Sequence, residues 1–266
     1  MKPADQGRVR VKREERRQAI MDLLVAARAV DLDDLAARFA VSKMTIHRDL
    51  DDLEQAGLLR KVRGGATIEA GTQFESDFRI RALQDGEAKI RMAHAARALI
   101  EPGMTVMVND GSMAALLGAS LTECAPLSVI TNNAAVIERL KDAPRVTLIA
   151  LGGIYSAKFN GFFGMVTESA LAGLHADLAF ISTPAVAGLR AFHMDDNAVR
   201  AKRAMMHAAE RSVLLVNHAR FGRSALHALA DLTEFDAIIT DAPPAPEDRA
   251  AIDRAGIALT IAKDPA

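Results

Sequence analysis

Residues 41–65 read VSKMTIHRDLDDLEQAGLLRKVRGG, and this stretch decides the fold of the N-terminal part of the chain. Ile46, Leu50 and Leu53 recur at spacings of four and three residues, which places them on one face of a helix. We therefore expect an amphipathic helix over about residues 42–56. Its apolar face would pack against other helices, and its opposite face would be left for solvent or a partner.

Polar and basic side chains occupy the outer face of this helix and the segment that follows it. Ser42 precedes the helix, where its hydroxyl can accept a hydrogen bond from a backbone N–H, and Gly57 follows it, where a left-handed residue often ends a helix. Leu58–Val62 and then Gly64-Gly65 predict a short hairpin. A helix start that offers hydrogen-bond donors suits the DNA major groove, so we predict a winged helix-turn-helix. The predicted DNA-binding residues are Ser42, Lys43, Met44, Thr45, His47, Arg48, Arg60, Lys61 and Arg63.

The residues before this helix fit the same prediction. A helix over Arg13–Ala27, a short strand around Asp31, and a helix over Asp34–Phe39 that is capped by Asp33 complete the expected head. The alternative is a solvated amphipathic helix whose charges bind nothing. The order of helices, caps and hairpin favours DNA binding.

Composition sets the broad class of the protein. The chain has 266 residues and is 50% hydrophobic, which is enough for one large domain and one small one. Residues 1–68 hold 14 Lys and Arg against 11 Asp and Glu, so a modestly basic head precedes an acidic body. Cys124 is the only cysteine, which excludes a disulfide within the chain and fits a reducing compartment. The sequence contains no visible signal peptide or membrane-spanning run, so we expect a cytoplasmic protein with no membrane partner.

Beyond the head, strands and helices alternate. Residues 69–86 have a thin apolar pattern and are expected to form a linker between domains at 13–68 and 87–266. The second domain should begin with an amphipathic helix over 87–100. Buried strands are then expected at 105–109, 127–131, 146–151, 178–182, 213–216, 237–240 and 257–261. Strands that are apolar throughout are buried on both faces, which predicts a Rossmann-like, mostly parallel α/β sheet covered by helices.

Short polar loops follow several of these strands. Ligands of parallel sheets bind outside the carboxyl ends of the strands, where helix N-termini present backbone N–H groups to anions. Lys202 and Arg220 can bring positive charge to the same edge. Each loop taken alone also fits an ordinary α/β turn. The predicted ligand-binding residues are Asp110, Gly111, Ser112, Thr131, Asn132, Asn133, Gly152, Gly153, Lys202 and Arg220.

These motifs resemble those of the DeoR family of regulators. Residues 41–66 resemble the DeoR-type helix-turn-helix, with His47 in TIHRDL where the family usually has Arg. The body resembles the DeoR-type sensor domain, which is similar in fold to sugar-phosphate isomerases such as ribose-5-phosphate isomerase. The segments that carry this resemblance are Asn109–Met113, Ile130–Asn133, Leu148–Gly153, Ala176–Phe180, Ala201–Met205 and Ile238–Asp241. The resemblance implies a repressor of a carbohydrate-catabolism operon, with double-stranded operator DNA and a phosphorylated sugar as its partners.

The chain departs from the family in one loop, and two other functions stay open. The family's D-x-S-K-F is Asn217–Phe221 here, NHARF, so Arg220 keeps only the charge of the usual Lys. The alternatives are a sugar-phosphate isomerase-like enzyme and a DNA-binding protein whose body only oligomerises. No catalytic residue, cofactor or metal site is predicted, since His193–Asp196 lacks a second His at metal-ligand spacing. A helix-turn-helix head usually binds symmetric half-sites, so we expect a homo-oligomer, either a dimer or a tetramer.

Overall fold

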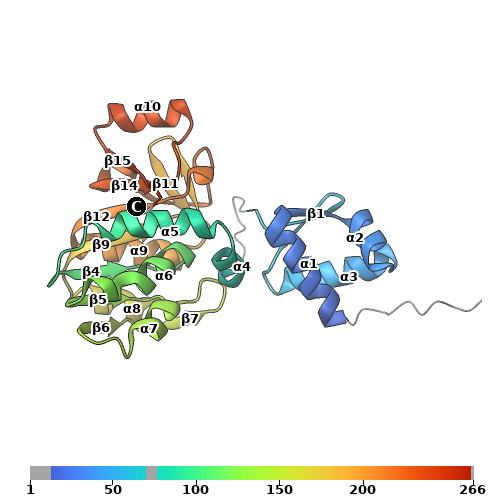
Figure 1. Ribbon diagram of the computed structural model, residues 1–266, viewed down its shortest axis with the longest axis horizontal. Coiled ribbons are helices and arrows are strands. Elements are labelled where there is room, and N and C mark those ends of the chain that lie inside the picture. Colours follow the sequence, from blue (N-terminus) through green and yellow to red (C-terminus); the bar gives the residue numbers. More distant parts are fainter. Residues whose placement is uncertain (1–12, 70–76, 265–266) are drawn as a thin grey trace, which may run out of the picture. The chain divides into compact units, whose positions relative to one another are not determined.

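The computed structural model describes residues 13–69 and 77–264, which belong to two compact units that divide after Glu69 (Figure 1). Residues 70–76, in the first half of the expected linker, lie outside the described residues. None of the helices in the described part of the chain is long and apolar enough to cross a membrane.

The smaller unit is a winged helix-turn-helix. Its elements are α1 (Arg13–Ala27), β1 (Ala29–Asp31), α2 (Leu32–Phe39), α3 (Lys43–Gln55), β2 (Arg60–Val62) and β3 (Gly65–Thr67). The wing is an antiparallel sheet in the order β1-β3-β2. Gly65 is required in the wing because a Cβ atom there would lie 1.9 Å from the carbonyl oxygen of Val30.

The caps of the head explain where its helices begin. The Ser42 hydroxyl accepts a hydrogen bond from the Thr45 amide at 3.2 Å, as the sequence predicts. The predicted cap of α2 is wrong by two residues. Asp31, rather than Asp33, is the N-cap, and it accepts hydrogen bonds from the amides of Asp33 and Asp34. Asp31, the last residue of β1, is therefore also the N-cap of α2.

Ion pairs, one of them buried, fix α3 against α1. Asp49 on α3 is 1% exposed, and its Oδ2 atom lies 2.5 Å from Nε of Arg16, which is also buried. Arg13 and Arg17 reach Asp52 one turn further along α3. A buried carboxylate is stable only when it is paired and hydrogen-bonded, so these contacts set the position of the exposed face of α3.

The larger unit is built on a seven-stranded parallel sheet. Its strands, in spatial order, are β15 (Ala258–Ile261), β14 (Ala237–Thr240), β12 (Ala209–Leu215), β9 (Ala176–Ser182), β4 (Thr105–Val108), β5 (Leu127–Thr131) and β6 (Val146–Ala150). All six strand pairs are parallel, as the apolar strands predict.

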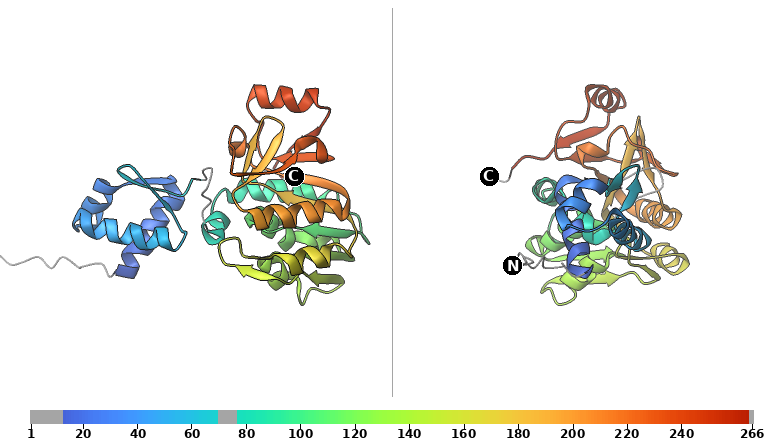
Figure 2. Two further views of the ribbon diagram at one scale, coloured as in Figure 1. Left: turned by 180° about the vertical axis from the view of Figure 1, so that it is seen from behind. Right: turned by 90° about the vertical axis from the view of Figure 1, so that its right-hand side faces the viewer.

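Helices cover both faces of this sheet (Figures 1 and 2). One face packs against α5 (Gly86–Arg97), α6 (Ser112–Ser120) and α7 (Ala134–Leu140). The other face packs against α8 (Met165–Leu171), α9 (Asp196–His207) and α10 (Pro246–Arg254). Two apolar cores therefore enclose the strands and leave the strand ends for polar groups.

Several short elements lie outside this pattern. They are α4 (Phe78–Leu83), the hairpin of β7 (Ile154–Ser156) and β8 (Gly161–Phe163), and a small antiparallel sheet of β10 (Ala185–Ala187), β11 (Arg190–His193) and β13 (His227–Asp231), with 3-10 turns at Leu121–Cys124, His218–Arg220 and Leu232–Glu234. The helix α4 lies within the expected linker but packs on the body, where the Phe78 amide donates to the Lys158 carbonyl at 2.9 Å.

Candidate functional site

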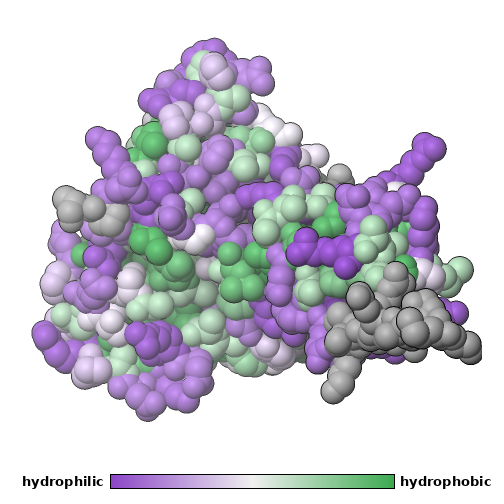
Figure 3. Space-filling view, turned by 45° about the vertical axis from the view of Figure 1, so that its right-hand side comes forward, coloured by the Kyte–Doolittle hydropathy of each residue, from purple (hydrophilic) through white to green (hydrophobic). Residues whose placement is uncertain are grey.

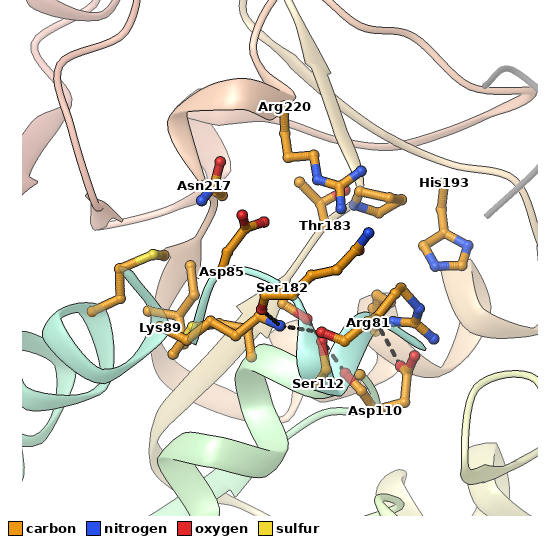
Figure 4. A pocket seen from close by; sticks show the side chains of 17 residues that line it. Arg81, Asp85, Lys89, Asp110, Ser112, Ser182, Thr183, His193, Asn217 and Arg220 are labelled. Atoms are coloured by element: carbon orange, nitrogen blue, oxygen red, sulfur yellow. Dashed lines mark hydrogen bonds and ion pairs between the residues drawn. The ribbon is translucent and has the colours of Figure 1, made fainter. Parts of the chain in front are cut away.

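A cavity opens at the carboxyl edge of the parallel sheet, where β4, β9 and β12 end (Figure 4). It measures about 620 Å³ when its open mouth is included. This strand-end cavity is lined by Arg81, Gln84, Asp85, Lys89, Met92, Asp110, Gly111, Ser112, Met113, Ser182, Thr183, Pro184, His193, Lys202, Leu215, Asn217 and Arg220.

An ion pair forms the floor of the strand-end cavity. Lys202 Nζ on α9 lies 2.7 Å from Asp110 Oδ1 in the loop after β4, and both side chains are 2% exposed. Burial by itself would raise the pKa of Asp110, but the charge and the hydrogen bond of Lys202, together with the charge of Arg81, lower it overall. Asp110 is therefore a carboxylate whose negative charge is held in place.

A side-chain amide next to Asp110 fixes the position of this loop. The Asn109 Oδ1 atom accepts a hydrogen bond from the Ser182 amide at 3.1 Å, and this contact ties the ends of β4 and β9 together.

On β11, His193 is 2% exposed, and its Nδ1 atom accepts a hydrogen bond from the Asp195 amide at 3.1 Å. A neutral imidazole that accepts at Nδ1 carries its hydrogen on Nε2, so His193 can act as a donor through that atom.

The loop after β12 brings Asn217 and Arg220 to the strand-end cavity. Asp241 is buried, and it accepts hydrogen bonds from the His218 amide at 2.7 Å and from His218 Nδ1 at 2.8 Å. The Asn217 side chain caps the following 3-10 turn by accepting a hydrogen bond from the Ala219 amide. These contacts hold the NHARF segment in a defined conformation although it departs from the family pattern.

The structure brings five of the ten predicted ligand-binding residues together in this cavity. They are Asp110, Gly111, Ser112, Lys202 and Arg220. Contrary to the prediction, Thr131, Asn132, Asn133, Gly152 and Gly153 are not among the lining residues.

Polar side chains at the end of β5 and directly after it donate hydrogen bonds to the protein's own backbone instead. Thr131 Oγ1 donates to the Val108 carbonyl at 2.6 Å, and Asn133 Nδ2 donates to the carbonyls of Asn109 and Gly111 at 3.1 and 3.0 Å. Asn132 Nδ2 similarly donates to the Phe162 carbonyl. Thr131 and Asn133 therefore support the end of β4 and the Asp110 loop, Asn132 supports β8, and none of the three lines the cavity.

The glycines after β6 serve close packing. Gly153 has φ 140°, and a Cβ atom there would lie 2.4 Å from Thr167 Oγ1. The Gly152 carbonyl accepts a hydrogen bond from the same hydroxyl at 2.6 Å. The pair therefore lets the β7–β8 hairpin approach α8.

Sequence reasoning missed the cavity residues contributed by α4 and α5. Arg81 and Gln84 are 7% and 8% exposed, although both lie in the expected linker. Lys89 Nζ donates to the carbonyls of Arg81 and Gln84 at the end of α4. The basic residues Arg81 and Lys89, on either side of the expected domain boundary at residue 87, were the one signal that could have found them.

The predicted DNA-binding residues lie on the exposed face of α3 and on the wing. Met44 is 61% exposed, and Arg48 and Arg63 are exposed with no ion-pair partner among the described residues. Two of the predicted cations are paired within the unit. Lys43 Nζ lies 2.7 Å from Asp33, and Lys61 Nζ lies 2.5 Å from Asp51.

Further predicted contacts differ in exposure and in hydrogen bonding. Ser42 is exposed, while Thr45, His47 and Arg60 are half-buried. The Ser42 and Thr45 hydroxyls hydrogen-bond each other at 2.9 Å. In the described part of the chain, no group of three or more His, Cys, Asp and Glu side chains could hold a metal ion.

A winged helix-turn-helix on the same chain as an α/β body with a charged cavity defines a class, the DNA-binding regulators that carry their own ligand-sensing domain. The chain belongs to the DeoR family of transcriptional regulators. The DeoR-like helix-turn-helix domain matches residues 16–71, and the DeoR C terminal sensor domain matches residues 84–242.

Named relatives and solved structures are similar to most or part of the chain. The glycerol-3-phosphate regulon repressor of Escherichia coli (strain K12) is 26% identical over 88% of this chain and 93% of the relative. The L-fucose operon activator of Haemophilus influenzae is 32% identical over 78% of this chain and 84% of the relative. Ribose 5-phosphate isomerase A of Methanocaldococcus jannaschii aligns with a TM-score of 0.37 and 18% identity over 50% of this chain and 53% of that chain.

Proposed function

We propose that the protein is a cytoplasmic repressor of a carbohydrate-catabolism operon, and that a phosphorylated sugar or polyol in the strand-end cavity modulates its binding to operator DNA. Family membership supports the regulatory role, and a relative named as the repressor of a glycerol-3-phosphate regulon supports the class of effector. A relative named as an activator makes the sign of regulation a matter for experiment.

The charge of the strand-end cavity is the observation that carries this proposal. Its lining holds four cationic side chains, those of Arg81, Lys89, Lys202 and Arg220, against the two carboxylates of Asp85 and Asp110. A phosphate dianion would balance this excess through charge-assisted hydrogen bonds. Arg220 is a candidate for the phosphate, because a planar guanidinium can donate two parallel hydrogen bonds to one phosphate group.

Neutral polar groups in the same lining suit the rest of a sugar or polyol. Ser112, Ser182 and Thr183 can each donate and accept a hydrogen bond, and Gln84 and Asn217 offer amides. A molecule with one phosphate and several hydroxyl groups satisfies both sets of residues. An uncharged sugar would satisfy the hydroxyls and amides but leave the cations unbalanced.

The head is proposed to bind DNA through α3 and the wing. Arg48 and Arg63 are the exposed cations of this surface that have no internal ion pair among the described residues. The hydroxyl of Thr45 and the imidazole of His47 lie on the same helix start and can donate to base edges or phosphates. Lys43 and Lys61 would exchange an internal carboxylate for a phosphate.

An isomerase reaction is the weaker proposal for the same cavity. Isomerisation needs a general base whose pKa lies near the working pH. Neighbouring cations lower the pKa of Asp110 instead, which makes this carboxylate a poor proton acceptor. A coupled assay with ribose 5-phosphate tests this alternative directly, and turnover by the purified chain would support it.

Oligomerisation is part of the proposal because symmetric operators bind paired heads. The body exposes large apolar side chains that a monomer would leave in water, among them Ile154 at 78%, Met165 at 80% and Val166 at 62%. Figure 3 shows hydrophobic areas on one face of the molecule, lying among hydrophilic residues.

Thermal shift against a matched set of compounds tests the effector proposal. Glycerol 3-phosphate, glucose 6-phosphate and fructose 6-phosphate are compared with glycerol, glucose and fructose, because a compound that binds only the folded state raises its melting temperature. The proposal expects a response to at least one phosphorylated compound that the Arg220→Gln variant loses. Arg223→Gln is the control, since Arg223 lies nearby in the chain but outside the cavity lining.

A further inference from the structure

The helix α4 occupies a special place in the chain. It starts at Phe78, close to the point in the chain where the DNA-binding unit ends at Glu69, and Asp77 is its N-cap. The same helix supplies Arg81 to the strand-end cavity, and Gln84 and Asp85 follow it there (Figure 4). The first helix in the described part of the body is therefore also a wall of its ligand cavity.

Contacts on two sides position the Arg81 side chain. Its Nη2 atom donates to the Lys158 carbonyl at 3.2 Å, and its guanidinium lies 5.8 Å from the centre of the Phe159 ring, a cation–π distance. On the other side, a Cβ atom at Gly111 would lie 3.8 Å from Arg81 Nη1. Arg81 thus joins the turn between β7 and β8 to the loop that carries Asp110.

The stability of α4 depends on these contacts. A helix of six residues is too short to be stable in water by itself. The carbonyls of Arg81, in α4, and of Gln84, its C-cap, accept hydrogen bonds from Lys89, another residue of the cavity lining. An anion that bound to Arg81 and Lys89 would compete with these contacts. It would therefore change the free energy with which α4 packs on the body.

We infer that α4 couples the strand-end cavity to the DNA-binding unit. Arg81 contacts the bound effector, and Phe159 positions the Arg81 side chain. This inference rests on the proposed function for the identity of the effector. An effector held by Arg81 and Lys89 shifts α4 between a docked and a loosened state, and that state sets the affinity of the head for DNA. Linkage is reciprocal, so operator DNA changes effector affinity by the same factor.

Two substitutions in one apolar cluster separate coupling from simple destabilisation. Phe159 and Phe163 are 3% and 5% exposed, and their rings lie 6.0 Å apart in the same cluster. The Arg81 guanidinium lies over the ring of Phe159. Phe159→Leu therefore removes the support of Arg81, while Phe163→Leu removes a similar amount of buried ring as the matched control.

The first measurement needs no effector. Operator affinity of the full chain is measured on a DNA fragment selected from random sequence by the wild-type protein. We expect Phe159→Leu to change the dissociation constant by about fivefold or more and Phe163→Leu to change it by less than about twofold. Hydrogen exchange of the amides at 78–84 should accelerate in Phe159→Leu alone. Equal operator affinities for both variants would overturn the inference.

The second measurement uses glycerol 3-phosphate and glucose 6-phosphate as probes. A probe that raises the melting temperature should also change exchange of the 78–84 amides in wild type, and should change operator affinity less in Phe159→Leu than in Phe163→Leu. A probe that binds and alters operator affinity without any change at 78–84 overturns the coupling through α4 but leaves the proposed function standing. If no probe binds, the proposed effector class fails, and the first measurement still decides the inference.

Discussion

Lys202 Nζ and Asp110 Oδ1 lie 2.7 Å apart at the floor of the cavity, and both side chains are 2% exposed. The two residues come from α9 and from the loop after β4, which are 92 positions apart in the chain. Their pairing brings a strand end of one half of the sheet into contact with a helix of the other half.

The first prediction concerns the stability of this pair. Breaking a buried pair by removing one partner costs about 3–5 kcal/mol, because the other charge stays buried without compensation. Lys202→Met and Asp110→Asn should each lower the free energy of unfolding by an amount of this order. The double variant should lose less than the sum of the two. Denaturant titration measures all four proteins, and strictly additive losses would contradict the assigned pairing.

The pH dependence of the same variants has a defined sign. The pKa of Asp110 is lower in the folded state, so its contribution to stability is fully present above the unfolded carboxylate pKa of about 3.9 and is lost as pH falls through the lower, folded value. The stability difference between wild type and Asp110→Asn should therefore narrow in acid. A difference that stays constant down to the acid transition would argue against an ionised Asp110.

The second prediction concerns base or phosphate contacts from α3. Arg48→Ala should weaken operator binding by about 1–3 kcal/mol if Arg48 reads a guanine or holds a phosphate. Arg38→Ala, on the exposed end of α2, is the control. A gel-shift titration that finds the same operator affinity for wild type and Arg48→Ala would remove α3 from the proposed interface.

The third prediction concerns the wing. Arg63 lies between β2 and β3 and is exposed, which suits a contact with the DNA backbone. Arg63→Ala should weaken binding to operator and non-operator DNA alike and should reduce the slope of log K against log salt by about one unit. The measurement is fluorescence anisotropy over a series of salt concentrations. A loss confined to the operator would instead assign Arg63 a role in reading bases.

The fourth prediction concerns assembly. The purified full chain should be a dimer or a tetramer, because a symmetric operator is bound by two heads. Met165→Glu, which charges the most exposed of the large apolar side chains on the body, should weaken this association if α8 is part of the interface. Light scattering at micromolar concentration measures the mass. A monomer both with and without DNA would refute the expected homo-oligomer.

Periodicity allowed most of the fold to be predicted from the sequence. Ile46, Leu50 and Leu53 are all buried on α3, as their spacing predicts. The strands from Thr105 onward are apolar and pair in a parallel sheet, because burial on both faces leaves a strong signal. The small sheet and α4 were missed because elements of three to six residues carry too few periodic positions.

The site was less predictable, because its members are defined by contacts distant in sequence. Asn133 is the kind of residue that binds ligand hydroxyls, yet its amide serves the carbonyls of Asn109 and Gly111. From the sequence, Arg81 is expected to belong to a linker. Only the structure shows its hydrogen bond to Lys158, which is 77 residues away in the chain. Residue type and strand-end position select candidates, but tertiary hydrogen bonding decides which of them face the cavity.

Operator affinity in the presence and absence of phosphorylated sugars tests the central proposal most directly. Fluorescence anisotropy at fixed salt is measured for wild type, Arg220→Gln and Arg223→Gln with the phosphorylated and unphosphorylated compounds of the thermal shift set. The account predicts that at least one phosphorylated compound changes the wild-type dissociation constant by about fivefold or more. Arg223→Gln should keep this response and Arg220→Gln should lose it. An operator affinity that no phosphorylated compound changes, or that an unphosphorylated one changes equally, would contradict the account.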